Sequence, residues 1–219
     1  MAMSRATAAP PAATDFEALH RRLSGQGPDW VRSFRSEAWG RFVLEGLPHH
    51  RMEAWRQTRI TAVAGSSFEP AAANTVLEGG DNGVFAGTLA QAPDQVREQV
   101  RQRLGTLAGH EGHPFTALAS SMLQNVTLVV LPAGHEAGDP VTIRHQAGPG
   151  TSLNVPRTVI LAGKGARATI VESFDGTESG SGYLTLPVTE IFCAEDAEIV
   201  YNRIQRDSPG SFHIGRVQA

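Results

Sequence analysis

The chain has 219 residues and a formal net charge of −3, from 19 Lys and Arg against 22 Asp and Glu. This length is enough for one sizeable core or two smaller ones, and the slightly acidic balance gives no general attraction to nucleic acid. The single cysteine, Cys193, excludes an internal disulfide and a cysteine-rich metal site, and it suits a reducing compartment.

Residues 1–13 are rich in Ala and Pro and lack the hydrophobic segment of a secretory signal. We therefore expect them to form a disordered tail. No apolar run in the chain approaches the roughly 18 residues of a membrane-spanning helix. The sequence accordingly predicts a cytoplasmic protein without a membrane partner.

Two helices are expected at the start of the folded part. The letters TDFE at 14–17 have the form of a capping box, and apolar residues follow at helical spacing, which predicts a helix over 15–24. Pro28 suits the first turn of a second helix, which Gly46 and Pro48 end.

The segment GLPHHRMEAWRQT (46–58) predicts a turn followed by one or two helical turns. Its adjacent residues His49 and His50 raise the question of a metal site. Neighbouring side chains point apart on a helix or a strand, however, and no acidic residue or cysteine stands at ligand spacing. We predict a solvated loop.

The remaining patterns of the N-terminal region, which we bound at 14–122, are weaker. We expect irregular linking structure at 61–80, one short strand at 83–89, a helix from Pro93 through Leu104, and a short apolar helix at 115–123. The letters HEGHP at 110–114 are not the HExxH motif of zinc proteases, because only two residues separate the histidines and the proline blocks a helix.

The C-terminal part, 123–219, is a succession of predicted strands, each rich in Val, Ile, Thr and Phe and bounded by Gly, Pro, Asp or Ser. The predicted strands cover 126–131, 141–146, 157–162, 168–174, 184–193, 198–205 and 212–218. Alternate strands begin about 30 residues apart, which predicts a stacked repeat of two strands and two corners. Such a repeat favours a coil of parallel β-structure in which each turn stacks on the next.

One pair of corners displays the repeat in detail. Residues 162–166 superpose on 193–197, and both read as a small polar turn, an Ala and then a β-rich run. We expect Ala166 and Ala197 to point into the coil at equivalent corners. An antiparallel sandwich is the alternative; it would favour Asn-Gly or Asp-Gly hairpin turns, and this part of the chain holds only one such pair, at 175–176.

The sequence assigns no catalytic, cofactor-binding or metal-ligating residue. It has neither a P-loop nor a GxSxG nucleophile elbow. Glu172, Glu190 and Asp175 lie on or beside strands and are candidates for the acid pair of a polysaccharide-cleaving enzyme, but their spacing does not single out a site. We predict that they are exposed corners and ladder partners. We expect Cys193 to be a buried, inert thiol.

Four segments of the chain resemble one protein family in matching order. They are GLPHHRMEAWRQT (46–58), HPFTALASSMLQNVTLVVLPAG (113–134), PRTVILAGKGARATIVESFDG (156–176) and YLTLPVTEIFCAEDAEIVYNRIQRDSPGSFHIG (183–215). The family is SufD, a non-catalytic subunit of the SufBCD iron–sulfur cluster assembly complex. Two departures are Gln57, where an aromatic residue is common, and the pair at 186–187. Pro187 fits a strand only at an edge or a bulge.

The resemblance implies a helical N-terminal region, a right-handed parallel β-helix over 123–219, and a C-terminal helical domain that the 219 residues do not contain. It implies a scaffold that pairs with a SufB-like paralogue through the β-helix and with a SufC-like ABC ATPase through the missing domain. We expect no cofactor in this chain, and a transient iron–sulfur cluster only at the level of the complex. No functional residue is carried over, and His213 is not equated with the SufD histidine thought to take part in assembly.

The last residues, FHIGRVQA, lie within a predicted strand. We therefore expect a fragment, truncated at its C-terminus, whose open edge makes it self-associate. Two other functions remain as alternatives. A β-helix carbohydrate-active enzyme would need secretion, clustered acidic residues and aromatic side chains for sugar stacking, yet Tyr183 and Tyr201 are the only tyrosines. A structural β-solenoid without partner chemistry is the second.

Overall fold

The structure is a computed structural model that describes residues 14–58, 60–71, 74–80, 83–177 and 182–219. Residues 1–13, for which the sequence predicts a disordered tail, lie outside these ranges. The described helices are α1 (Phe16–Ser24), α2 (Asp29–Glu45), the 3-10 helix η1 (Glu53–Trp55), α3 (Thr61–Ala64), α4 (Asp94–Arg103) and α5 (Pro114–Ser121). None of these helices is long and apolar enough to cross a membrane.

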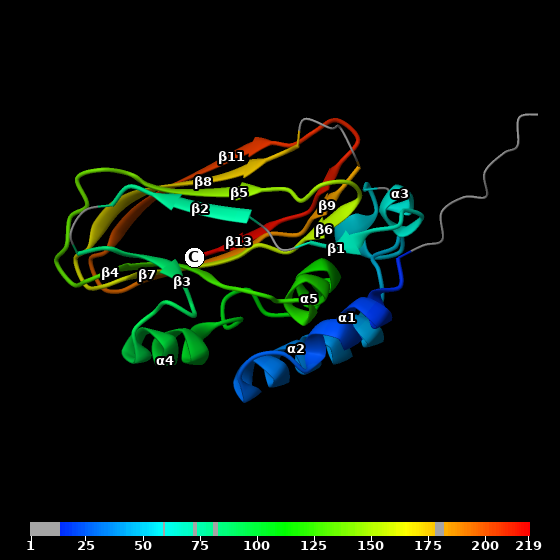
Figure 1. Cartoon of the computed structure of the whole chain (residues 1–219), viewed down its shortest axis with the longest axis horizontal. Helices are drawn as coiled ribbons and strands as arrows, with labels where there is room; N and C mark the ends of the chain where they lie inside the picture. The colour runs from blue at the N-terminus through cyan, green and yellow to red at the C-terminus, as the bar shows by residue number, and fades with distance from the viewer. Residues whose placement is uncertain (1–13, 59, 72–73, 81–82, 178–181) are drawn as a thin grey trace, which may run out of the picture.

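The strands of the described ranges form three sheets (Figure 1). The first sheet has the order β1-β6-β9-β12, the second β13-β10-β7-β4-β3, and the third β11-β8-β5-β2. The strands are β1 (Glu69–Pro70), β2 (Asn74–Glu78), β3 (Phe85–Thr88), β4 (Thr127–Leu131), β5 (Val141–Gln146), β6 (Ser152–Asn154), β7 (Arg157–Ala162), β8 (Arg167–Asp175), β9 (Leu184–Thr185), β10 (Val188–Cys193), β11 (Glu198–Arg206), β12 (Phe212–His213) and β13 (Arg216–Gln218).

The chain passes through the three sheets in turn. β6, β7 and β8 lie in the first, second and third sheet, and β9, β10 and β11 repeat that order. Each strand pairs in parallel with the strand three places further along, β6 with β9, β7 with β10 and β8 with β11. We call each such passage a turn of the coil. With its helices, the chain is a mixed α/β protein with parallel and mixed sheets, a broader class than the mainly β coil that the sequence predicts.

Each turn contains three strands, whereas the sequence predicts two. The prediction misses β6, which has 3 residues, and it merges β9 and β12, with 2 residues each, into longer strands, because strands this short show no periodicity. The predicted strands 184–193 and 212–218 each divide into two. Pro187 lies in the first of these breaks, outside both strands, where its missing N–H interrupts no ladder.

The expected equivalence of the two corners is confirmed by the register. Ala162 is the partner of Cys193 at the end of the β7–β10 ladder, and the β8–β11 ladder resumes with the same offset. Between the ladders, Gly165 and Asp196 occupy the same corner position, and both have a positive φ, of 66° and 58°. Glycine adopts this left-handed conformation freely, and Asp is one of the few other residues that tolerate it.

Helix α1 forms where the sequence predicts it, but its cap differs. Asp15 is the N-cap, and its carboxylate accepts a hydrogen bond from the backbone N–H of Ala18 at 2.9 Å. The Thr14 hydroxyl instead donates to the carbonyl of Ser66 at 3.1 Å and accepts from the N–H of Phe68 at 2.7 Å. Thr14 thus connects the start of α1 to the segment that leads into β1.

The prediction of irregular linking structure at 61–80 is wrong, because this segment contributes β1 and β2, which pair with the first turn of the coil. We call the end that β1, β2 and β3 cover the closed end of the coil. β1 pairs with β6 in parallel, whereas β2 pairs with β5 and β3 with β4 in antiparallel fashion. Each sheet therefore begins with a strand from 69–88. These strands cover edges that would otherwise present unpaired N–H and C=O groups. The short strand predicted at 83–89 is confirmed as β3.

One apolar core lies on each face of the second sheet. Inside the coil, alternate strand residues such as Ile143 and Ile160 are fully buried. On the outer face, Val159 of β7 belongs to a cluster with Val31 of α2 and Val100 of α4. Helices α2 and α4 lie on this side of the coil in Figure 1. β7 is consequently buried along its whole length.

The orientation of the corner alanine side chains can be tested by substitution. Ala166 is fully buried within the interior core, so Ala166→Leu should lower the free energy of unfolding by about 1–3 kcal/mol through overpacking. Ala194→Leu is the matched control, because Ala194 is exposed in the next corner. Equal thermal unfolding midpoints for the two variants would contradict the inward orientation of Ala166.

Candidate functional site

A fully buried carboxylate, that of Glu172, lies in the middle of β8. Successive strand residues point to opposite faces of a sheet. Ile170 and Phe174, two positions to either side, are buried. Glu172 therefore points into the coil with them, and 0% of its surface is exposed.

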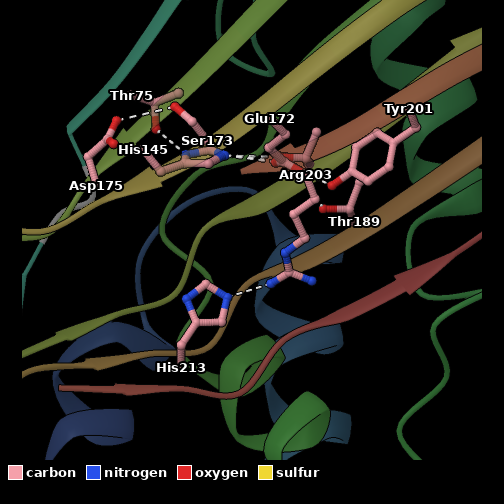
Figure 2. A network of polar contacts seen from close by, with 10 residues as sticks. Thr75, His145, Glu172, Ser173, Asp175, Thr189, Tyr201, Arg203 and His213 are labelled. Carbon is pink, nitrogen blue, oxygen red and sulfur yellow. Dashed lines mark hydrogen bonds and ion pairs between the residues drawn. The ribbon is translucent and has the colours of Figure 1, made fainter. Parts of the chain in front are cut away.

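Four side chains donate hydrogen bonds to the Glu172 carboxylate, in the network that Figure 2 shows. Oε1 accepts from Nε2 of His145 at 2.8 Å and from the Thr158 hydroxyl at 2.5 Å. Oε2 accepts from the hydroxyls of Thr189 at 2.7 Å and Tyr201 at 2.5 Å. The donors lie on β5, β7, β10 and β11. One carboxylate thus joins successive turns of the coil.

These donors keep Glu172 ionised. Burial by itself works to raise the pKa of the carboxyl group, but the hydrogen bond and charge interaction with His145, followed by the hydrogen bonds of Thr158 and Tyr201, lower it to about 2. Burial and the neighbouring carboxylate raise the pKa of the Tyr201 phenol. Nδ1 of His145 lies 2.9 Å from the hydroxyl of Thr75, which extends the network to β2 at the closed end.

A second polar cluster lies on the other side of the Phe174 ring. Arg203 of β11 donates to Nε2 of His213 at 2.5 Å, and Nδ1 of His213 is 2.9 Å from Oδ2 of Asp207. Phe174 stacks on His145 and meets the His213 ring edge-on, each at a centroid distance of 5.0 Å. Burial works to raise the pKa of Asp207, but its hydrogen bonds, first that with His213, hold the pKa below its usual range.

Glu190 of β10 is a second carboxylate with 0% of its surface exposed, and it faces the loop that follows α4. Its Oε1 accepts from the backbone N–H groups of Leu107 at 3.0 Å and Ala108 at 2.9 Å. Its Oε2 accepts from the N–H of Gly105 at 2.9 Å and from the guanidinium of Arg157 on β7. Burial lowers the pKa of Arg157, and the charge of Glu190 opposes that shift. The pair fastens the helical region to the second sheet.

The candidate acid pair of the sequence is not formed. Glu172 and Glu190 are fully buried, which corrects the prediction of exposed corners. Thr189, which contacts Glu172, and Glu190 are consecutive in β10 and so point to opposite faces. The two carboxylates therefore face different spaces. Asp175 is a ladder partner as predicted, since it pairs with Arg206 across β8 and β11 and accepts from Nε at 2.6 Å.

The remaining candidates of the sequence lie apart from these networks. Cys193 is exposed at the end of β10, so the prediction of a buried thiol is wrong. Partial desolvation raises the pKa of this thiol, which favours the protonated form. His49 and His50 are exposed, as predicted for a solvated loop. Within the described ranges, no three His, Cys, Asp or Glu side chains are grouped to hold a metal ion.

Sequence reasoning missed the partners of Glu172, above all His145 and Tyr201. One signal was present in β8, because Glu172 is in phase with Ile170 and Phe174, and an acidic residue in phase with an apolar face predicts a buried carboxylate. The donors lie on strands that are far apart in the sequence, and only the parallel register brings them together.

Residues 143–219 match the family described as SUF system FeS cluster assembly, SufBD core domain. This range begins within β5 and runs through the repeating turns of the coil. Protein ABCI7, chloroplastic, of Arabidopsis thaliana is 24% identical over 140 residues, which cover 61% of this chain and 29% of that protein. An iron–sulfur cluster assembly SufBD family protein of Synechocystis is 25% identical over 207 residues, which cover 77% of this chain and 46% of that protein.

The family match thus falls on the parallel turns of the coil. The buried Glu190 carboxylate attaches these turns to the helical region. The chain is therefore similar to the SufBD family of the SUF system of iron–sulfur cluster assembly. It spans less than half the length of the two relatives. At the level of the SufB/SufD family, the resemblance read from the sequence is confirmed.

Replacing Glu172 by Gln should lower the free energy of unfolding by about 3–5 kcal/mol at pH 7. It should also make the free energy of unfolding fall less as the solution is acidified. The carboxyl has a pKa of about 2 in the folded chain, against about 4.3 when unfolded. Ionised Glu172 therefore stabilises the fold above pH ~4.3, and this contribution is lost as the pH falls toward 2, at roughly 1.4 kcal/mol per unit of pKa difference. Urea unfolding at neutral and acid pH should show a smaller acid loss in Glu172→Gln than in wild type.

The control for this experiment is Glu195→Gln. Glu195 is exposed and pairs with Lys164 at the surface, at 2.6 Å, and such pairs contribute only about 0–1 kcal/mol. The control should keep the wild-type loss of stability in acid. An unchanged acid dependence in Glu172→Gln would contradict a lowered pKa for Glu172.

Glu190→Gln should loosen the loop that follows α4, because an amide nitrogen cannot accept the hydrogen bonds of Gly105 and Arg157. Native-state hydrogen exchange should show faster exchange of the Gly105, Leu107 and Ala108 amides than in wild type. The amide of Leu104 bonds within α4, to the carbonyl of Val100, and serves as the internal control. Equal acceleration of all four amides would indicate general destabilisation and would contradict a local anchor.

Proposed function

We propose that the chain is a SufD-like scaffold subunit of the SUF machinery, without catalysis of its own, that supports iron–sulfur cluster assembly and iron acquisition. It pairs with a SufB-like paralogue through the coil. A SufC-like ABC ATPase drives the complex through a contact outside residues 1–219. The cluster is a transient product of the whole complex. The location is the cytoplasm, in keeping with a single cysteine and a reducing compartment.

The observation that carries this proposal is the SufBD core match over 143–219, which coincides with the repeating turns. The choice of SufD within the family rests on the four ordered segments between 46 and 215. The name of the Synechocystis relative describes it as an iron–sulfur cluster assembly protein of the SufBD family, which agrees with a place in the SUF system.

The hydrogen bonds of the two buried carboxylates support a scaffold role. Glu172 and Glu190 each accept four hydrogen bonds from the protein. A carboxylate has about four acceptor positions, so neither residue has capacity left for a substrate proton. Their charges serve instead to hold turns and helices together. This is the work expected of a rigid platform for partner subunits.

We also infer that the coil forms a right-handed parallel β-helix. The supporting observations are the three sheets visited in turn and the parallel pairing of strands three places apart. Crossover connections between parallel strands are right-handed in about 98% of cases. Stacking of identical turns provides a long, stiff surface for a paralogue with the same repeat.

The carbohydrate-active alternative loses its principal support. Glycosidases place two carboxyl groups about 5–10 Å apart around one cleft. Glu172 faces the coil interior, whereas Glu190 faces the loop after α4. A structural solenoid without partners stays as the outcome against which the scaffold is tested.

Affinity purification from the native cells, followed by mass spectrometry, tests the role. Two tagged baits are compared, residues 1–219 and a version extended with the family's C-terminal turns and helices. The extended bait should recover a SufB-like paralogue and an ABC-type ATPase above an untagged control. The bait of 1–219 should lack the ATPase, because the proposal sets that contact outside it.

Recovery of neither partner by a folded extended bait would reject the scaffold role in favour of a solenoid without partners. Tight binding of the ATPase to residues 1–219 alone would reject the proposed position of that contact. Circular dichroism of both baits should accompany the purification, so that a misfolded bait is not counted.

A further inference from the structure

A cavity of about 630 Å³ lies where the helical region meets the last strand of the coil. Its wall is built by three parts of the chain, α2, the loop that follows α4, and β13. The ionisable side chains that line it are those of Glu37, Arg41, His110, Glu111, His113 and Arg216. None of them belongs to the Glu172 network, and the family match assigns them no role.

His110 is the least satisfied polar group of this wall. Its Nε2 is buried and has no hydrogen-bond partner within the described part of the chain. The ring is held against the edge of Phe34, at a centroid distance of 5.2 Å and an interplanar angle of 61°. A buried polar atom without a partner is costly and marks a place where a ligand atom can bind.

Burial, more than the neighbouring charges, favours the neutral form of the His110 imidazole. Burial lowers the pKa of His110, and the charges of Arg157 and Arg216 lower it further, against the opposing effect of Glu37 and Glu190. Burial and Arg216 likewise lower the pKa of His113. A neutral imidazole can present an N–H at Nε2, and the surrounding guanidinium groups favour an anion there.

Arg216 supplies the cation on the β13 side of the cavity. Its Nη1 donates to the carbonyl of Gly109 at 2.7 Å, which fixes the guanidinium against the loop that carries His110. An arginine held in this way retains N–H groups that can bind a carboxylate in a forked geometry. Arg41 is engaged differently, because it lies 4.0 Å from Glu111 and both are partly exposed.

We propose that this cavity binds a small monocarboxylate, which accepts hydrogen bonds from the Arg216 guanidinium and from Nε2–H of His110. The proposal does not depend on the SufD-like role. The class of ligand follows from the charges of the wall, where Arg41 and Arg216 are balanced by Glu37 and Glu111. A singly charged group matches one arginine fork, whereas a dianion such as phosphate would be repelled by the two carboxylates.

The test is a titration of the whole chain with sodium acetate, followed by NMR of its histidine rings at constant ionic strength. The His110 signals should shift in a saturable manner below about 100 mM acetate. The signals of His49 and His50, exposed on the loop after α2, should not move. Inorganic phosphate at the same ionic strength should bind about tenfold more weakly or not at all.

Arg216→Gln should weaken acetate binding about tenfold or more, because it removes the charged fork. Arg51→Gln is the matched control, since Arg51 is exposed outside the cavity, and it should bind acetate like wild type. Should Arg216→Gln fail to fold, Arg216→Lys keeps the charge without the fork and should show weakened binding. A His110 signal that acetate does not shift, equal binding of phosphate, or wild-type affinity in a folded Arg216 variant would overturn the proposal.

Discussion

The ionised carboxylate of Glu172 imposes the strictest requirement on the coil. Taking such a charge out of water costs several kcal/mol unless hydrogen bonds replace its hydration. Here they come from His145, Thr158, Thr189 and Tyr201, each on a different strand. A slip of any one strand by one residue would turn its donor to the other face. The register of the successive turns is therefore coupled to a single charged group.

Glu190 extends the same principle from the interior of the coil to its outer wall. Its carboxylate accepts backbone N–H groups of the loop after α4, and Arg157 supplies the compensating charge. Apolar packing of α2 and α4 on the second sheet is not directional, so it does not by itself define how the helical region is oriented. The hydrogen bonds to Glu190 are directional and therefore define the position of the loop after α4. This loop continues into the wall of the cavity around His110.

The two ends of each sheet within the structure are built differently. At one end β1, β2 and β3 cover all three sheets, and two of these pairings are antiparallel. Reversal of strand direction is possible there because no identical turn has to stack on the covering strand. Beyond this closed end every pairing within the coil is parallel, as a stacked repeat requires.

The sequence by itself determined the long strands, the corner equivalence of Ala162 and Cys193, and the resemblance to the SufB/SufD family, because each depends on local pattern or on a repeat within the chain. β5 and β7 were predicted to the residue. Only the tertiary structure decided the third strand of each turn, the antiparallel closed end, and the burial of Glu172 and Glu190. The physical reason is that burial and short-strand pairing depend on what covers a face, and those covering residues come from distant parts of the chain.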